Sequence, residues 1–270
     1  MIRRDTERKH QFADNLFSEM KIFDLQGLLK NDTNYKCGLE CYQVRRFTDI
    51  DFSKLDKEVE KSRCIFCAKL NVPYYIIFTE EMDRYYRIYK VSISNDDIEY
   101  TLTWEFNTSS FIMWWRNQQN FSQSKPMYNA SKRIESSIID KVLFENSLAW
   151  GMNIDGFSLN DNNEIYAIYE KRICTYKPPY TVENYDPNRF FKGTATRAGD
   201  FYSWNLLYEL SINLDAHLFL LTFDTSVRRL FGFSEIIDID SNGIKYRKGV
   251  KPYEKVFRGI DEFRSSINEL

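Results

Sequence analysis

The chain has 270 residues, which is enough for one large domain or two modest ones that each bury a hydrophobic core. Aromatic residues make up 16% of the sequence and glycine and proline are few, so the composition is globular rather than disordered or fibrous. The formal net charge of -2 excludes attraction of nucleic acid by overall charge, and any such contact needs a local basic patch. Because no apolar run resembles a signal peptide or a transmembrane span, we expect a cytoplasmic protein with no membrane partner.

The elements expected in the first part of the chain alternate between helices and strands. A helix over 6–29 is predicted from apolar residues at a spacing of three to four, and a polar stretch over 117–129 is the best linker in the sequence. This linker predicts an N-terminal α/β region over 1–125, suited to target recognition or partner binding, and a second domain over 126–270. Between the first helix and the linker we expect a strand over 39–47, a helix over 55–70, strands over 74–78, 85–91 and 99–106, and a short helix over 109–117.

Four of the five cysteines fall in this N-terminal region. Cys37 and Cys41 are spaced C-x3-C and Cys64 and Cys67 are spaced C-x2-C, so four thiolates could form a structural zinc site. The alternative is that they are buried free cysteines, the commoner outcome in a reducing compartment. The odd fifth cysteine, Cys174, argues against a disulfide framework.

The second domain reads as a helix followed by a strand hairpin and a further helix and strands. The first helix is expected over 131–150 with Gly151 as its C-cap, and Asp200 is expected to cap the second. The fold class is therefore α/β (mixed α+β), with a central mixed sheet flanked by helices. The remaining elements are strands over 153–159, 164–174, 218–223 and 229–239, a turn over 160–163, a helix over 200–214 and a C-terminal helix over 259–270.

One arrangement occurs in both regions. A helix, the strand 72–79 and the aromatic strand 85–89 resemble in order and spacing a helix, the strand 217–224 and the strand 229–233. This echo indicates either two related halves or a chance likeness between aromatic strands.

A group of charged residues in the second domain suggests chemistry. Strand alternation places Glu170 and Arg172 on one face, and a hairpin across 160–163 brings Asp155 near Glu170. Two convergent carboxylates are oxygen ligands for a hard divalent cation, with positions left for water and phosphate. The structural alternative is that Asp155-Gly156 is a turn and that Glu170 and Arg172 belong to a solvated strand face.

This order of helix, Asp-bearing strand, Glu-x-base strand, helix and apolar strand resembles the PD-(D/E)XK nuclease superfamily, with its restriction-endonuclease-like core. The resemblance implies that Asp155 and Glu170 bind Mg²⁺ or Mn²⁺, and that Glu135 in the preceding helix is an auxiliary acid. Arg172 stands where the family has lysine, which keeps the charge but cannot be deprotonated. Ile154 stands in place of the family's proline.

The loop after the Glu-bearing strand is the candidate nucleic-acid surface. It interleaves basic with aromatic residues, and cations contact phosphates while aromatic rings stack on unpaired bases. An ordered aromatic loop that covers the sheet is the alternative. The basic residues are Lys177, Arg189, Lys192 and Arg197, and the aromatic ones are Tyr176, Tyr180, Tyr185, Phe190 and Phe191.

The sequence predicts a Mg²⁺-dependent endonuclease that hydrolyses phosphodiester bonds in DNA rather than RNA, in restriction, defence or a mobile element. The alternative is a catalytically inactive module of the same fold that binds nucleic acid or a protein. In either case the N-terminal region could bind a partner protein or a second copy of the chain. No glycine-rich phosphate loop is present, and the two histidines argue against Ser-His-Asp or Cys-His catalysis.

Overall fold

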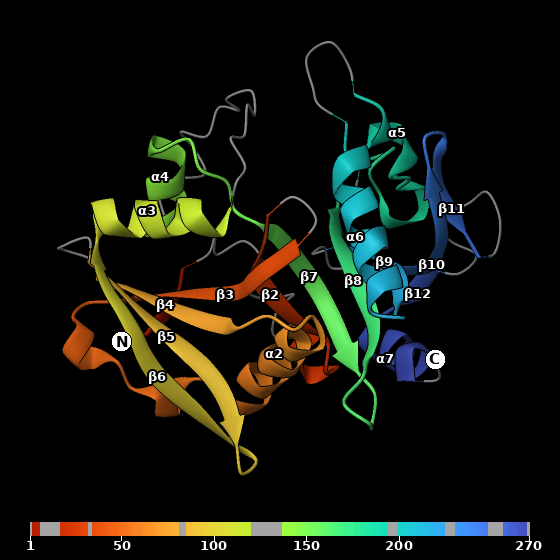
Figure 1. Cartoon of the computed structure of the whole chain (residues 1–270). Helices are drawn as coiled ribbons and strands as arrows, with labels where there is room; N and C mark the ends of the chain where they lie inside the picture. Colours follow the sequence, from red (N-terminus) through yellow and green to blue (C-terminus); the bar gives the residue numbers. More distant parts are fainter. Residues whose placement is uncertain are drawn as a thin grey trace. The chain divides into compact units, whose positions relative to one another are not determined.

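The computed structural model describes residues 2–5, 17–31, 34–80, 85–119, 137–175, 177–193, 199–224, 230–247 and 256–268. The chain forms two compact units, Met1–Ile154 and Asp155–Leu270, called here the N-terminal and C-terminal units (Figure 1). The described strands form a 12-stranded mixed β-sheet and helices pack against it, so the mixed α+β class predicted from the sequence is confirmed. Within the described residues, no helix has the length and apolar character needed to cross a membrane.

The N-terminal unit contains the strands β2-β3-β4-β5-β6 of this sheet, in that order, with β1 paired to β3. Neighbouring strands are antiparallel except β3 and β4, which run parallel and are joined through helix α2. The strands are β1 (Arg3–Arg4), β2 (Phe23–Asn31), β3 (Asn34–Val44), β4 (Tyr74–Glu80), β5 (Tyr85–Ser94) and β6 (Asp97–Asn107). The helices are η2 (Phe47–Asp49), η3 (Phe52–Lys54), α2 (Lys57–Lys69), α3 (Thr108–Gln118) and α4 (Ile138–Glu145).

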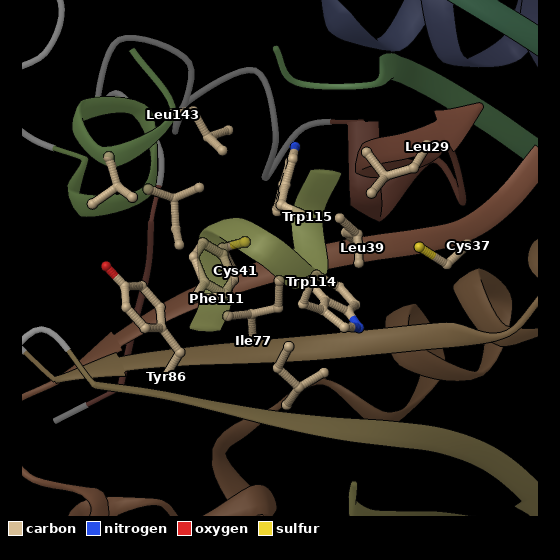
Figure 2. Packing of buried hydrophobic residues seen from close by; sticks show 13 residues of the cluster. Leu29, Cys37, Leu39, Cys41, Ile77, Tyr86, Phe111, Trp114, Trp115 and Leu143 are labelled. Atoms are coloured by element: carbon tan, nitrogen blue, oxygen red, sulfur yellow. The ribbon is translucent and has the colours of Figure 1, made fainter. Parts of the chain in front are cut away.

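The two faces of strand β3 separate two kinds of interior. Cys37, Leu39 and Cys41 face an apolar cluster that contains Trp115 and other residues of α3 and α4 (Figure 2). The intervening residues face the other way, because side chains alternate along a strand. On that side a Cβ added to Gly38 would lie 2.2 Å from the Cys67 sulfur.

This alternation bears on the zinc alternative. Cys37 and Cys41 pack among apolar side chains on one face of β3, whereas Cys67 lies against the opposite face at Gly38. All five cysteines are free, and burial raises the pKa of the Cys37, Cys41 and Cys67 thiols above the ordinary value. The described residues therefore favour buried free cysteines over a zinc clip.

The helix predicted over 6–29 is wrong in its C-terminal part, where Phe23–Asn31 is the strand β2. Phe23, Leu25 and Gly27 are buried and alternate with the half-buried Asp24 and Gln26, a period of two that the helix-like spacing of the upstream apolar residues concealed. The backbone changes direction just before, at Lys21, which has a φ of 55°. Residues 6–16 lie outside the described part of the chain.

Helix α4 ends earlier than the sequence suggested. Its C-cap is Asn146, followed by Ser147 in the left-handed region with a φ of 54°, so Gly151 is not the C-cap. Gly151 has another role, because a Cβ there would lie 2.2 Å from the Leu28 carbonyl oxygen of β2. The start of the predicted helix, 131–136, and most of the predicted linker lie outside the described residues. Asp5 accepts hydrogen bonds from the amides of Ile138 and Ile139 at the start of α4.

The C-terminal unit contains the strands in the order β7-β8-β9-β10-β11, with β12 paired to β10. Strands β8 and β9 are parallel and are joined through helix α6, and the other pairs are antiparallel. The strands are β7 (Met152–Leu159), β8 (Ile165–Cys174), β9 (His217–Asp224), β10 (Leu230–Asp240), β11 (Gly243–Tyr246) and β12 (Val256–Arg258). The helices are η5 (Val182–Asn184), α5 (Asn188–Phe191), α6 (Phe201–Asn213) and α7 (Ile260–Asn268).

The two units repeat the same succession of elements, a strand hairpin, a helix, a parallel strand and two antiparallel strands. Helices α2 and α6 both have 13 residues, and the N-cap is Asp56 in one and Asp200 in the other. In the parallel pairs Glu40 lies opposite Ile76 and Glu170 opposite Leu220. Each of these partners comes 20 positions after the helix N-cap, so the likeness extends to the register. The repeated order supports the reading of two related halves.

Candidate active site of the C-terminal unit

The hairpin of β7 and β8 positions the predicted acids. Its turn at 160–163 has the expected residues, with the Asn160 side chain accepting hydrogen bonds from the amides of Asn162 and Glu164. Asn163 takes a left-handed φ of 56°, a conformation that asparagine tolerates. The turn fixes the register so that Gly156 lies opposite Tyr169.

Asp155 and Glu170 are the next residues along this antiparallel ladder, and opposite residues share a face of the sheet. The Lys171 amide donates a hydrogen bond of 3.2 Å to Asp155 Oδ2, which holds the half-buried carboxylate at the β8 strand. Asp155 and Glu170 thus follow the last paired residues of the ladder, and the charge of Asp155 acts on Glu170.

Arg172 completes the group on the same face of β8. Its Nη2 lies 2.7 Å from Glu170 Oε1, and its guanidinium lies 5.9 Å from the centre of the Trp204 ring. The Arg172 side chain is 33% exposed and the Glu170 side chain 10%, so the ion pair lies between solvent and interior. Burial, the largest single influence, disfavours the charged guanidinium, but the charges of Glu170, Tyr185, Asp155 and Asp200 together outweigh it and raise the pKa of Arg172.

Glu170 is a buried acid with a shifted pKa. Burial raises the pKa of Glu170 to about 8, with the charge of Asp155 adding to the effect and Arg172 opposing it. Asp200 raises this pKa further, and Lys171 opposes it together with Arg172.

Asp200 occupies the N-cap position of α6, as predicted, but its side chain makes no capping hydrogen bond. Its charge instead raises the pKa of both Glu170 and Arg172. Asp200 is thus an electrostatic member of the site that the sequence assigned to helix capping alone.

The residues of this site fit a divalent cation of the Mg²⁺ or Mn²⁺ type. Asp155 and Glu170 offer carboxylate oxygens from one face, and Mg²⁺ is commonly held by one or two carboxylates with water and phosphate completing its coordination. No group of three or more His, Cys, Asp or Glu side chains within the described residues is arranged around one point, so the protein would supply two acidic ligands here.

The loop between β8 and α6 exposes three of the four predicted nucleic-acid contacts, Lys177, Arg189 and Lys192. Arg197, Tyr176 and the auxiliary acid Glu135 lie outside the described residues. Several loop aromatics pack against one another, with Phe190 stacked on Tyr180 at 5.9 Å and 6.3 Å from Tyr185. The aromatic part of the loop therefore forms a small packed cluster, and the three basic side chains remain on its surface.

Two members of this region were not foreseen as functional. Thr222 lies opposite Arg172 in the parallel register of β8 and β9, and Trp204 comes from the first turn of α6. The sequence placed Trp204 only within the helix expected over 200–214, and Thr222 only within the strand expected over 218–223. The signal for both is the register across α6, which a sequence does not display.

Comparison with known proteins gives no further assignment: no family model, no curated protein and no solved structure matches this chain.

Proposed function

We propose that the C-terminal unit is a divalent-cation-dependent phosphodiesterase that cleaves DNA, on a restriction-endonuclease-like core. One observation carries the proposal: Asp155 and Glu170 share a face of the β7–β8 hairpin, with Arg172 bound to Glu170 at 2.7 Å. The raised pKa of Glu170 agrees with a site that gains a cation in its working state.

Asp155 and Glu170 are the residues that would hold Mg²⁺ or Mn²⁺. Such a cation supplies Lewis-acid stabilisation of a phosphoryl oxygen and lowers the pKa of water bound to it. The Lys171 amide orients Asp155, and the β8 backbone fixes Glu170, so neither ligand needs to be ordered at the moment of binding. The two acids differ in burial, and Glu170 is the one whose ionisation depends on added positive charge.

Arg172 would bind the scissile phosphate. Its guanidinium is permanently charged and one-third exposed, so it can exchange Glu170 for a phosphate oxygen without leaving the site. In this reading the ion pair in the free protein holds Arg172 in place until substrate arrives. The exposed Lys177, Arg189 and Lys192 would add backbone contacts along the DNA.

The test is cleavage of plasmid and oligonucleotide DNA with Mg²⁺ or Mn²⁺. Asp155→Ala and Glu170→Ala should each lower the rate at least ~10²–10³-fold, the usual loss when a group that stabilises developing charge is removed. Asp161→Ala is the matched control, because this exposed acid lies in the turn of the same hairpin. Equal cleavage by wild type and both site variants would remove these acids from the mechanism.

The Arg172–Glu170 ion pair also favours a second function, a nuclease-fold module that binds nucleic acid or protein without cleaving it. A guanidinium that stays on Glu170 would occupy one of the two carboxylates and exclude the cation. Arg172→Lys separates the two functions. If the protein is an enzyme, Arg172→Lys should cleave DNA at least as fast as the wild type. If it is a binding module, neither the wild type nor Arg172→Lys should cleave DNA with any metal.

A further inference from the structure

We infer that Arg172, Thr222 and Trp204 form a binding subsite for a tetrahedral oxyanion, the phosphate of the substrate. The inference rests on the proposed function in that it names the group the site recognises. It depends on different residues from the two acids that would hold the cation. Arg172 and Thr222 are neighbours on one face of β8 and β9, and the Trp204 ring of α6 lies beside the guanidinium.

The three side chains carry hydrogen-bond donors that lack acceptors. Arg172 Nε, Trp204 Nε1 and Thr222 Oγ1 are all buried and have no hydrogen-bond partner within the described part of the chain. Trp204 and Thr222 are each only 1% exposed, so solvent does not reach these atoms. Buried donors without acceptors destabilise a fold, and three at neighbouring positions indicate that an acceptor belongs there.

The N-terminal unit offers an internal comparison, because the repeated register identifies the equivalent positions. Tyr42, Glu60 and Phe78 stand where Arg172, Trp204 and Thr222 stand. There the acceptor is internal: Glu60 accepts hydrogen bonds from Tyr42 at 2.9 Å and from Tyr74 at 2.5 Å. Phe78 brings no polar atom and stacks on Tyr42 at 5.7 Å.

The C-terminal unit has exchanged this internal carboxylate for an indole N–H and the phenyl ring for a hydroxyl. The place that holds a carboxylate acceptor in one unit therefore holds two N–H donors and a hydroxyl in the other, all three without a hydrogen-bond partner among the described residues. A ligand from outside the chain would accept these hydrogen bonds. A ligand with several oxygens can accept from all three groups at once. An oxyanion also suits the guanidinium, and a phosphate bound here would lie next to the two acids that would hold the cation.

Access to the subsite is through Arg172, the one exposed member. When Arg172 turns from Glu170 towards a phosphate, its guanidinium and Nε can contact the anion together with Thr222 and Trp204. The acids Glu170, Asp155 and Asp200 act electrostatically on Arg172 and oppose an anion nearby, so binding should strengthen when Mg²⁺ is added.

The experiment measures binding of inorganic phosphate to the full chain by calorimetry, with and without Mg²⁺. Thr222→Val removes the hydroxyl and keeps the shape, and Trp204→Phe removes the N–H and keeps a ring beside Arg172. Each should weaken binding about tenfold, the loss of one hydrogen bond to a charged group. Thr79→Val is the matched control, a buried threonine of β4 whose hydroxyl bonds the Tyr42 carbonyl, and it should leave phosphate affinity unchanged.

Two DNA oligonucleotides, with and without a 5′-phosphate, then identify the source of the anion. If Thr222→Val lowers the affinity for both oligonucleotides, the subsite binds an internal phosphodiester. If it lowers the affinity for the phosphorylated oligonucleotide alone, the subsite binds a 5′-phosphate at the end of the DNA chain. Either result supports the inference. Unchanged affinity for phosphate and both oligonucleotides, with Thr222→Val as stable as wild type, would show that the donors bind a buried water only and would overturn it.

This outcome is separable from failure of the proposed function. If Thr222→Val weakens phosphate binding but the wild type cleaves no DNA, the subsite stands and the nuclease does not. If cleavage depends on Asp155 while Thr222→Val changes neither phosphate binding nor cleavage, the nuclease proposal stands and the subsite does not.

Discussion

The two units carry the same hairpin, helix and parallel strand but neutralise their buried glutamates differently. In the N-terminal unit Glu40 is 0% exposed and both its oxygens accept from Arg4, at 2.7 and 2.8 Å. Arg4 and Arg63 also each bind Asp24, at 2.6 and 2.8 Å, which closes the network. In the C-terminal unit Glu170 has one guanidinium partner among the described residues, Arg172.

The position opposite each glutamate shows the same contrast. Gln26 Oε1 accepts from the Cys41 amide at 2.9 Å, and Asp155 Oδ2 accepts from the equivalent Lys171 amide at 3.2 Å. One unit has a neutral amide at this position and the other a second carboxylate. One frame therefore holds a closed network of buried ion pairs in the N-terminal unit and a pair of acids beside one guanidinium in the C-terminal unit, and the difference lies in a few side chains.

The largest expected effect tests whether the N-terminal network is structural. Arg63 is 3% exposed and binds Asp24 and Glu60, each at 2.8 Å, so Arg63→Met should lower the free energy of unfolding by ~3–5 kcal/mol because buried carboxylates lose their partner. Arg172→Met should cost about 1 kcal/mol or less, since its pair is partly exposed and Glu170 can take up a proton. Urea unfolding at pH 7 measures both, and equal costs would contradict the comparison.

The next effect concerns pH in metal-free buffer. The pKa of Glu170 is raised from 4.5 to about 8 in the folded chain. Below pH 4.5 its carboxyl is therefore protonated in both the folded and the unfolded chain. As the pH rises towards 8, the unfolded chain releases this proton while the folded chain retains it, and stability falls. We expect a loss of roughly 2–4 kcal/mol between about pH 5 and 8 that Glu170→Gln removes. If the stability of the wild type and of Glu170→Gln changes with pH in the same way, the ionisation of Glu170 does not destabilise the folded chain and this prediction is wrong.

The smallest effect separates the two helix N-caps. Asp56 accepts hydrogen bonds from the Glu58 and Val59 amides of α2, so Asp56→Ala should destabilise the N-terminal unit by ~1 kcal/mol. Asp200 makes no capping hydrogen bond, so Asp200→Ala should cost less than about half of that. It should also shift the pH profile of Glu170 to lower pH, because a neighbouring negative charge is removed. Thermal unfolding at several pH values measures both effects.

Much of the fold was predictable because most elements carry a clear period and clear ends. The strands β4, β5, β8, β9 and β10 and the helices α2 and α6 agree with the predicted ranges to within a few residues. The pairing of β7 with β8 in a hairpin was also predictable, since an asparagine-rich turn joins the two strands.

The parts that escaped prediction depend on contacts distant in sequence. Strand β2 was taken for a helix because apolar residues before it happen to follow a helical spacing. The Arg4, Asp24 and Glu40 network joins three segments, and Thr222 meets Arg172 only through a parallel pairing across α6. Such pairings are set by packing of the whole unit and leave no local pattern.

The most direct test of the central claim is calorimetric titration of Mn²⁺ into the wild-type chain, Asp155→Asn and Gln26→Ala. We predict one site in the wild type, lost in Asp155→Asn and retained in Gln26→Ala, which alters the equivalent position of the N-terminal unit. Two results would contradict the account: the wild-type chain does not bind Mn²⁺, or Asp155→Asn binds Mn²⁺ as tightly as the wild type does.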